Sequence, residues 1–208
     1  MHRRSLLAGA LSLSGLAAVG PALAQVQALP RADRTLVEQA AAYLQGLRTA
    51  KARFSQTSSR GGTAAGTLYL NRPGKARFEY DPPAEMLVVS DGRNVSVYDR
   101  RLKTFDRTPL GATPLAIFLA RRISLEEDVK VVRVTRSDDG FSVTVVDAKS
   151  PASGRLVLDF AQDPIALRGW TVVDGQGIET RIRLSGFTPG GSFDPALFVL
   201  ADPRRAAG

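Results

Sequence analysis

Residues 66–80 have the sequence GTLYLNRPGKARFEY, and this stretch decides the fold. Apolar and polar side chains alternate on both sides of Arg72-Pro73-Gly74. A period of two is that of a β-strand, and the Pro-Gly pair favours a turn. The stretch therefore predicts a hairpin whose strands each direct one apolar face toward a core. The apolar positions are Leu68, Leu70, Ala76, Phe78 and Tyr80.

The same alternation recurs along most of the chain after residue 50. The repeating segments are separated by turn signals such as Asp91-Gly92 and Asp139-Gly140, in which glycine accepts the positive φ of tight hairpin turns. Strands joined by tight turns pair antiparallel. The sequence therefore predicts a mainly β domain with one antiparallel sheet of about eleven strands. The expected strands are residues 51–59, 66–72, 75–81, 85–90, 94–99, 103–108, 129–136, 140–147, 154–161, 166–173 and 177–187.

Helical periodicity precedes the first expected strand. Thr35 and Glu38 have the spacing of a capping box, and apolar residues follow at intervals of three and four. We expect an amphipathic helix over residues 35–48. Its apolar stripe would consist of Leu36, Val37, Ala40, Ala41, Leu44 and Leu47.

A second helical segment interrupts the strands. Thr113 can serve as N-cap and Pro114 as the first helical residue. The residues from Leu115 to Ile123 are apolar almost all round, and a helix of this kind must be buried on several sides or cover an apolar surface. Arg121 and Arg122 would lie near its carboxyl end. A further short helical turn is expected between Asp194 and Leu200.

An open sheet of eleven strands has to curl, and the two helices would then lie across its concave face. If side chains fill the concave side, the protein is an inert sandwich. If the concave side is partly empty, it is a binding cavity. The aromatic residues are core residues by default, and local sequence does not separate core from cavity lining. They are Phe54, Phe78, Tyr80 and Trp170.

Arg72 is unusual because it falls on the same strand face as Leu68 and Leu70. A cation on an apolar face needs partners, and backbone carbonyls at the end of a covering helix would supply them. Alternatively, Arg72 lies beyond the end of the strand and points into water. The residues alone leave both interpretations open.

The first 24 residues have the pattern of a signal peptide. Arg3 and Arg4 provide a basic start, residues 6–19 are apolar, and Ala22-Leu23-Ala24 has the small-x-small cleavage pattern. Both a Sec signal and a twin-arginine signal fit this start. We therefore expect residues 1–24 to be removed and residues 25–208, beginning at Gln25, to form one exported domain.

Composition excludes most catalytic chemistry. The only histidine is His2, inside the expected signal peptide, and the chain has no cysteine. This excludes Ser-His and Cys-His nucleophilic sites and nearly all zinc sites. The chain also lacks the cysteine to which the lipid of an anchored lipoprotein is attached. The carboxylates include Asp138-Asp139, Asp159 and Glu126-Glu127-Asp128, but no pair stands out. We expect no enzyme, cofactor or metal.

The formal net charge is +8, from 28 Lys and Arg against 20 Asp and Glu. These cations are scattered, without a dense run interleaved with aromatic residues, so the sequence argues against nucleic-acid binding. A positive surface could suit anionic lipid headgroups or an acidic partner, or could simply be a solvated surface.

Several of these stretches resemble the LolA family of periplasmic lipoprotein carriers. The similarity is carried by Phe54-Ser55-Gln56, by residues 66–80, and by the sequence LVVSDG at 87–92 followed by Val97-Tyr98-Asp99. The sequence TPLAIFLA at 113–120 also looks like the family's central helix. The resemblance covers most of the chain and is most specific between residues 54 and 120.

The resemblance implies an incomplete antiparallel β-barrel of eleven strands, with helices forming a lid over a concave apolar face. It implies that Arg72 holds the lid closed through hydrogen bonds, which favours the first of the two interpretations above. It further implies a cavity for the acyl chains of lipoproteins. The cavity residues would be Phe54, Leu68, Leu70, Phe78, Tyr80, Val88, Val97, Ile117 and Phe118.

By the same resemblance, the protein would be a periplasmic monomer that takes lipoproteins from an inner-membrane ABC-type releasing complex and delivers them to an outer-membrane acceptor. The alternatives are a periplasmic module of the same shape that carries other lipids, such as glycolipids, and an envelope-stress sensor module.

Overall fold

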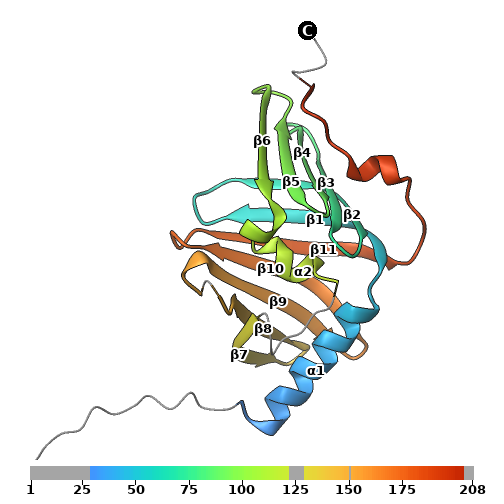
Figure 1. The fold of residues 1–208 in the computed structure, drawn as a ribbon. Coiled ribbons are helices and arrows are strands. Elements are labelled where there is room, and N and C mark those ends of the chain that lie inside the picture. Colours follow the sequence, from blue (N-terminus) through green and yellow to red (C-terminus); the bar gives the residue numbers. More distant parts are fainter. Residues whose placement is uncertain (1–28, 122–128, 150, 204–208) are drawn as a thin grey trace, which may run out of the picture.

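The computed structural model describes residues 29–121, 129–149 and 151–203. The expected signal peptide and Glu126-Glu127-Asp128 lie outside these residues. A single sheet of eleven strands runs through the described part of the chain (Figure 1), as the sequence predicts. The strands are β1 (Thr49–Ser58), β2 (Thr63–Asn71), β3 (Lys75–Tyr80), β4 (Met86–Asp91), β5 (Asn94–Asp99), β6 (Thr104–Pro109), β7 (Val129–Ser137), β8 (Gly140–Asp147), β9 (Gly154–Gln162), β10 (Ile165–Asp174) and β11 (Glu179–Pro189).

The sheet consists of two meanders joined by the first and last strands. The strand order is β6-β5-β4-β3-β2-β1-β11-β10-β9-β8-β7, and each assigned strand pair is antiparallel. β1 pairs with β2 on one side and with β11 on the other, with Phe54 opposite Leu184. β6 and β7 remain the two edges, so the barrel is incomplete.

Two helices accompany the sheet. α1 (Arg31–Gly46) lies against β7, β8 and β10 (Figure 1). Its buried residues, Leu36, Val37, Ala40 and Leu44, all belong to the predicted stripe, whereas Ala41 is only partly buried and Leu47 follows the helix. The capping-box prediction is wrong. The helix begins one turn earlier, after Pro30, whose fixed φ suits a helix start. The Thr35 hydroxyl instead donates to the carbonyl of Arg31, at 3.3 Å.

The central helix is shorter than predicted. A 3₁₀ turn, η1 (Leu110–Ala112), precedes α2 (Leu115–Leu119), which ends before Ala120. Thr113 does not cap this helix, because its hydroxyl donates back to the carbonyl of Leu110, at 2.8 Å. Arg121 lies beyond the helix, and residues 122 and 123 are outside the described part of the chain. α2 therefore belongs to the connection that crosses between the edges β6 and β7.

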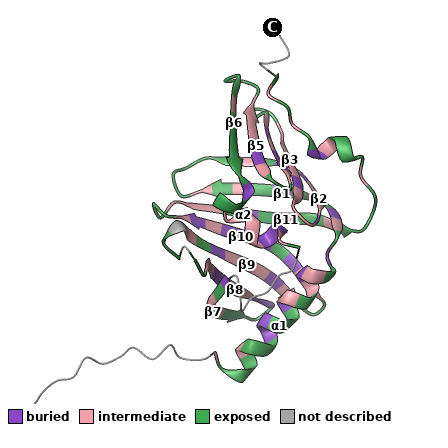
Figure 2. Ribbon diagram, in the orientation of Figure 1, coloured by how far each residue is buried: buried purple, intermediate pink, exposed green. Residues whose placement is uncertain are grey.

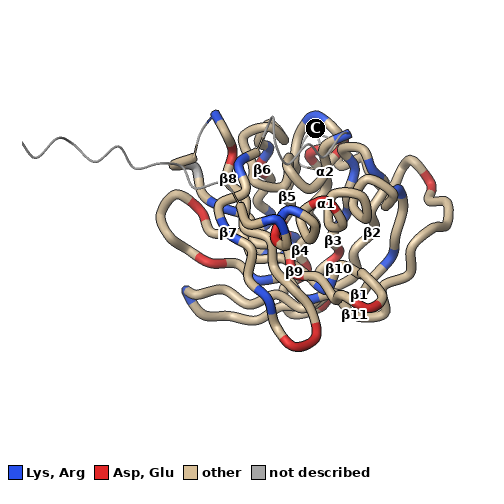
Figure 3. The backbone as a smooth tube through the Cα atoms, turned by 90° about the horizontal axis from the view of Figure 1, so that it is seen from below, with Lys and Arg blue, Asp and Glu red and all other residues tan. Residues whose placement is uncertain are grey.

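A core forms between the helices and the concave face of the sheet. Buried positions alternate with more exposed ones along most strands, whereas β6 is exposed along most of its length (Figure 2). Lys and Arg are spread over many elements (Figure 3). The largest side chains that are almost completely buried include Phe54, Leu68, Leu70, Leu158, Phe160 and Leu119.

The convex side of β1–β4 is also covered, which was not expected. After β11 the chain crosses this side and forms the predicted short helical turn, η3 (Pro195–Phe198). We call residues 190–203 the strap. Arg77 on β3 donates to the carbonyl of Leu197 at 2.9 Å and pairs with Glu79 at 2.7 Å. The strap thus gives the sheet a second, smaller apolar layer.

Candidate functional site

Arg72 follows β2 and joins the sheet to both helices. Its side chain is buried, with 6% exposed. Nη1 donates to the carbonyls of Leu44 and Leu47, the latter at 3.2 Å, and Nη2 donates to the carbonyl of Ala120 at 2.8 Å. These carbonyls lie at the carboxyl ends of α1 and α2, where unsatisfied acceptors carry partial negative charge. One guanidinium thus holds both helices, which together we call the lid.

The backbone near Arg72 adds further lid contacts. The amide of Gly74 donates to the carbonyl of Leu119 at 2.8 Å, and the amide of Arg72 donates to the carbonyl of Arg48 at 2.7 Å. The side-chain amide of Gln45 donates to the carbonyl of Arg121 at 3.1 Å, which links α1 to the chain just after α2. The Arg72-Pro73-Gly74 turn is therefore the point where the sheet holds the lid.

Electrostatics weaken this contact. Burial, followed by repulsion from Arg48, lowers the pKa of Arg72 to about 10. The guanidinium stays charged at neutral pH, and its partners among the described residues are carbonyl dipoles, not carboxylates. Its Nε has no hydrogen-bond partner in the described residues. A buried cation that no described carboxylate neutralises is costly, so the closed lid gains less stability than three hydrogen bonds would suggest.

The apolar side chains of α2 pack on the concave face of the sheet. Phe118 and Leu119 are 2% and 1% exposed. The Phe118 ring stacks on Trp170 with centroids 5.1 Å apart. Leu115 and Ile117 are partly buried against the same core. The sequence left open whether the concave side is empty or filled. The concave side is filled over Trp170, and the side chain that fills it, Phe118, belongs to the lid.

The structure places the predicted cavity residues on one continuous apolar surface. Leu68 lies opposite Phe78, Phe78 opposite Val88, and Val88 opposite Val97, which forms a row across β2–β5. The Phe54 ring contacts the rings of Phe78 and Tyr80, at 5.6 and 5.0 Å. Leu70 follows Leu68 by two residues on β2 and therefore lies on the same face. Ile117 and Phe118 face this surface from α2.

One polar pair lies within this apolar surface. Tyr80 donates to the Oε1 of Gln56 at 2.6 Å, and burial raises the pKa of Tyr80 to about 12. The phenol therefore stays neutral at physiological pH.

The other half of the apolar surface was missed as a site. Trp170 was assigned to the core by default, and the strands after residue 129 carried no distinctive motif. The alternation of Leu156, Leu158 and Phe160 along β9 could have indicated this surface, because these positions share the face that meets the lid. The remaining members include Phe141, Val143, Val145 and Ile182.

A cavity of about 290 Å³ opens beside α2, between the lid and the ends of β8 and β9. Pro114, Ala116 and Ile117 line it on the lid side, and Leu156 and Gly154 line it on the sheet side. The cavity borders the buried surface on which α2 lies. Displacement of α2 would extend it toward Trp170.

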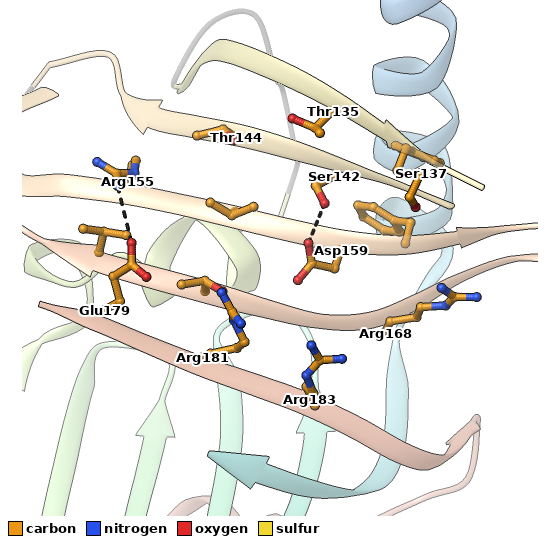
Figure 4. A pocket seen from close by; sticks show the side chains of 15 residues that line it. Thr135, Ser137, Ser142, Thr144, Arg155, Asp159, Arg168, Glu179, Arg181 and Arg183 are labelled. Atoms are coloured by element: carbon orange, nitrogen blue, oxygen red, sulfur yellow. Dashed lines mark hydrogen bonds and ion pairs between the residues drawn. The ribbon is translucent and has the colours of Figure 1, made fainter. Parts of the chain in front are cut away.

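A polar groove of about 490 Å³ lies on the opposite face of the sheet (Figure 4). Ser142 donates to Asp159 there at 2.6 Å, and Arg155 pairs with Glu179 at 3.7 Å. Charged and hydroxyl side chains suit water or polar partners, so this groove does not extend the apolar surface. Its labelled lining includes Thr135, Thr144, Arg168, Arg181 and Arg183.

Two of the carboxylates considered for catalysis, Asp139 and Asp159, have structural partners. Asp139 pairs with Arg168 at 2.6 Å, which lowers the pKa of Asp139, and Asp159 accepts from Ser142. Within the described ranges, no group of three or more His, Asp or Glu side chains is placed to hold a metal ion. No helix in the same ranges is both long and apolar enough to cross a membrane.

Known proteins resemble the chain in sequence and in fold. A family model described as outer membrane lipoprotein carrier protein LolA matches residues 45–201. An outer-membrane lipoprotein carrier protein of Chromobacterium violaceum is 28% identical over 180 residues, covering 83% of this chain and 86% of that protein. One of Methylococcus capsulatus is 29% identical over 182 residues, with the same coverage of both chains. A DUF1329 family protein from Desulfovibrio piger shares the fold, with a TM-score of 0.53 at 13% identity over 81% of this chain and 96% of that one.

Proposed function

Because the chain belongs to the LolA family of outer membrane lipoprotein carrier proteins, we propose that it binds the acyl chains of lipoproteins and carries them across the periplasm. The observation that supports this most directly is the position of Arg72, which ties both helices to the sheet over one apolar face. A fixed core would not need a buried cation that, among the described residues, is held by backbone carbonyls alone.

The cargo explains why such a cover is useful. Exposure of an acyl chain to water costs about 0.8 kcal/mol per CH₂ group, so an acylated protein needs an escort through an aqueous compartment. The escort must cover the chains and also release them. A lid that competes with the cargo for one apolar surface meets both needs.

The filled interior defines the binding step. Phe118 occupies the space over Trp170, so acyl chains enter as α2 moves away, starting at the cavity beside α2. In the empty carrier the lid closes again and Arg72 regains its carbonyls. The apparent affinity for cargo is then reduced by the fraction of molecules that are closed. Moderate affinity favours release.

In this proposal the acyl chains contact the predicted cavity residues on β1–β5 and the face of β9–β11 around Trp170. No covalent step is involved. The carrier would act as a periplasmic monomer, exported by residues 1–24, between an inner-membrane ABC-type releasing complex and an outer-membrane acceptor. These partners are proposed from the family alone.

A photo-crosslinking amino acid at Phe78, in cells that depend on this protein, tests the proposal. Phe78 lies in the apolar row across β2–β5, so we expect crosslinks to acylated lipoproteins, identified by mass spectrometry. The matched control places the same crosslinker at Glu79, the next residue, whose side chain lies on the opposite strand face.

Two results would contradict the proposal. Equal lipoprotein crosslinking from positions 78 and 79 would mean that the apolar surface is not the site. Free glycolipids or phospholipids on the Phe78 variant, in place of lipoproteins, would identify a carrier of other lipids.

A further inference from the structure

The turn between β5 and β6 is distinct from the rest of the surface. Residues 100–103 have the sequence Arg-Arg-Leu-Lys, and all four are exposed. Leu102 is 61% exposed and is one of three large apolar residues that are exposed among the described residues. The turn lies at the far end of the arm formed by β4, β5 and β6, at the top of Figure 1. It therefore presents one apolar side chain among three cations, away from the body of the protein.

Local contacts fix this turn. The Asp99 carboxylate accepts from the backbone amide of Leu102 at 2.9 Å, and the amide of Arg100 donates to the carbonyl of Glu85 at 3.3 Å. Lys103 has a positive φ of 54°, a conformation that favours glycine or asparagine. The backbone thus holds Leu102 outward, where it gains nothing from the protein's own core.

The acidic groups nearby offset the charge of the tip only in part. The Asp99 oxygen is used within the turn, and Asp81 on the neighbouring β3–β4 loop pairs with Arg53. Glu85 is exposed on that same loop. The charge over residues 100–103 is +3, and it is +1 when Asp99 and Glu85 are included, so cations remain in excess at the tip.

We propose that residues 100–103 form a membrane-contact tip, which docks the protein on the surface of an anionic phospholipid bilayer. Cations near such a surface are attracted to the lipid phosphates, and a leucine between them can enter the boundary between headgroups and acyl chains. A hairpin turn that only meets water commonly uses Gly, Asn, Asp or Ser. An exposed leucine between cations at the end of this arm is better suited to contact with a bilayer surface than to contact with water alone.

The expected binding is weak and reversible. Each cation near an anionic surface contributes about fivefold in affinity, so three contribute on the order of a hundredfold. Insertion of Leu102 adds about tenfold. This contact would hold the protein at a membrane only transiently, and it does not depend on the proposed carrier function, since it requires no cargo.

Vesicle sedimentation tests the tip. The protein used begins at Gln25 and retains all described residues, so the amino-terminal apolar segment does not interfere. Vesicles contain either phosphatidylethanolamine with phosphatidylglycerol, or phosphatidylcholine alone. We expect binding to the anionic vesicles at low salt and no binding to the neutral vesicles. Binding to the anionic vesicles should be lost at 0.5 M salt, because salt screens the attraction between the cations and the lipid phosphates.

Two variants isolate the tip. The first variant removes the three cations by combining Arg100→Gln, Arg101→Gln and Lys103→Gln, and it should lower the affinity for vesicles on the order of a hundredfold. The second variant, Leu102→Gln, should lower this affinity about tenfold. The matched controls are Arg34→Gln, Lys130→Gln and Arg183→Gln combined, which remove the same charge from exposed positions elsewhere, and Val199→Gln, which removes another exposed apolar residue. Both controls should bind like the unaltered protein.

Three results would overturn the proposal. They are absence of binding to anionic vesicles, an equal loss of binding in the charge-matched control, and unchanged binding of Leu102→Gln. An independent measurement uses Leu102→Trp, whose added fluorescence should shift to the blue only with anionic vesicles. Circular dichroism of each variant separates loss of binding from loss of folding.

Discussion

Phe118 on α2 stacks on Trp170 on β10, with ring centroids 5.1 Å apart and planes inclined by 27°. The two residues belong to opposite parts of the proposed machinery, since one is carried by the lid and the other by the sheet. Trp170 also contacts Phe78 edge-on, at 6.2 Å. A single indole thus connects the lid to both halves of the apolar surface. Because Trp170 is the only tryptophan in the chain, its fluorescence reports lid position without any label.

Replacement of Phe118 with alanine should open the lid. The change removes the stacked ring, and loss of a buried phenylalanine side chain costs about 3 kcal/mol. We expect a red shift of Trp170 emission and stronger binding of an environment-sensitive apolar dye, with β-sheet circular dichroism retained. Phe193→Ala, which removes a ring from the strap, is the control and should leave Trp170 emission unchanged. An unshifted spectrum for Phe118→Ala would argue against a movable lid.

Replacement of Arg72 with leucine should leave folding and acyl binding largely intact while it slows release. Without the guanidinium, the carbonyls of Leu44, Leu47 and Ala120 lose their common donor, and the closed state no longer competes as strongly with cargo. A shift of about 1.4 kcal/mol in the lid equilibrium corresponds to about tenfold slower release. The measurement is transfer of a fluorescent lipoprotein to acceptor in a reconstituted assay. Arg34→Leu, which replaces an exposed cation on α1 away from the latch, serves as control. Unchanged release from Arg72→Leu would refute the latch.

Replacement of Arg72 with lysine should make the lid sensitive to pH. Burial lowers the pKa of the Arg72 cation in the closed state, and the same burial would hold a lysine there below its usual pKa of about 10.4. The closed state then binds fewer protons than the open state, so rising pH favours closure. We expect apolar dye binding by Arg72→Lys to fall as pH rises from 7 toward 10.

The unaltered protein is the reference for this titration. Its Arg72 pKa of about 10 predicts a nearly constant dye signal up to about pH 9, and Arg72→Leu predicts no dependence from this site. A signal that rises with pH in Arg72→Lys would mean that the cation stabilises the closed state more than its burial destabilises it.

Local sequence was sufficient for the strands because each one carries its own period and its own turn. The hairpin around Arg72-Pro73-Gly74 and the Asp-Gly turns fix neighbouring pairs. The pairing of β1 with β11 joins residues more than a hundred positions apart, with Phe54 opposite Leu184, and no local pattern indicates it. The capping-box prediction at Thr35 was wrong because the helix already begins after Pro30. Leu36 and Val37 are buried by packing on the sheet, which does not require a cap at Thr35.

The site was predictable on one side only. Arg72 stood out because a cation interrupted an apolar face, whereas Trp170 was indistinguishable from an ordinary core residue until α2 was placed against it. The filling of the concave side was equally hidden, because a lid residue and a core residue have the same composition. The helical turn in the strap was predicted, but its position over the convex face was not, because its contacts with Arg77 and Arg107 come from carbonyls, which every residue possesses.

The strap itself should be a structural element, and its stability contribution can be tested. Phe198 is 1% exposed, and the neighbouring Phe193 contacts Tyr69 on the convex side of the sheet at 5.6 Å. Phe198→Ala leaves a cavity beneath the strap, so we expect the free energy of unfolding to fall by about 3 kcal/mol. Val199→Ala changes the next residue, which is 66% exposed, and should alter stability by less than about 0.5 kcal/mol. Urea denaturation followed by circular dichroism measures both. Because the strap lies on the opposite side of the sheet from Trp170, Phe198→Ala should leave dye binding in the native state unchanged, and increased dye binding would instead link the strap to the lid.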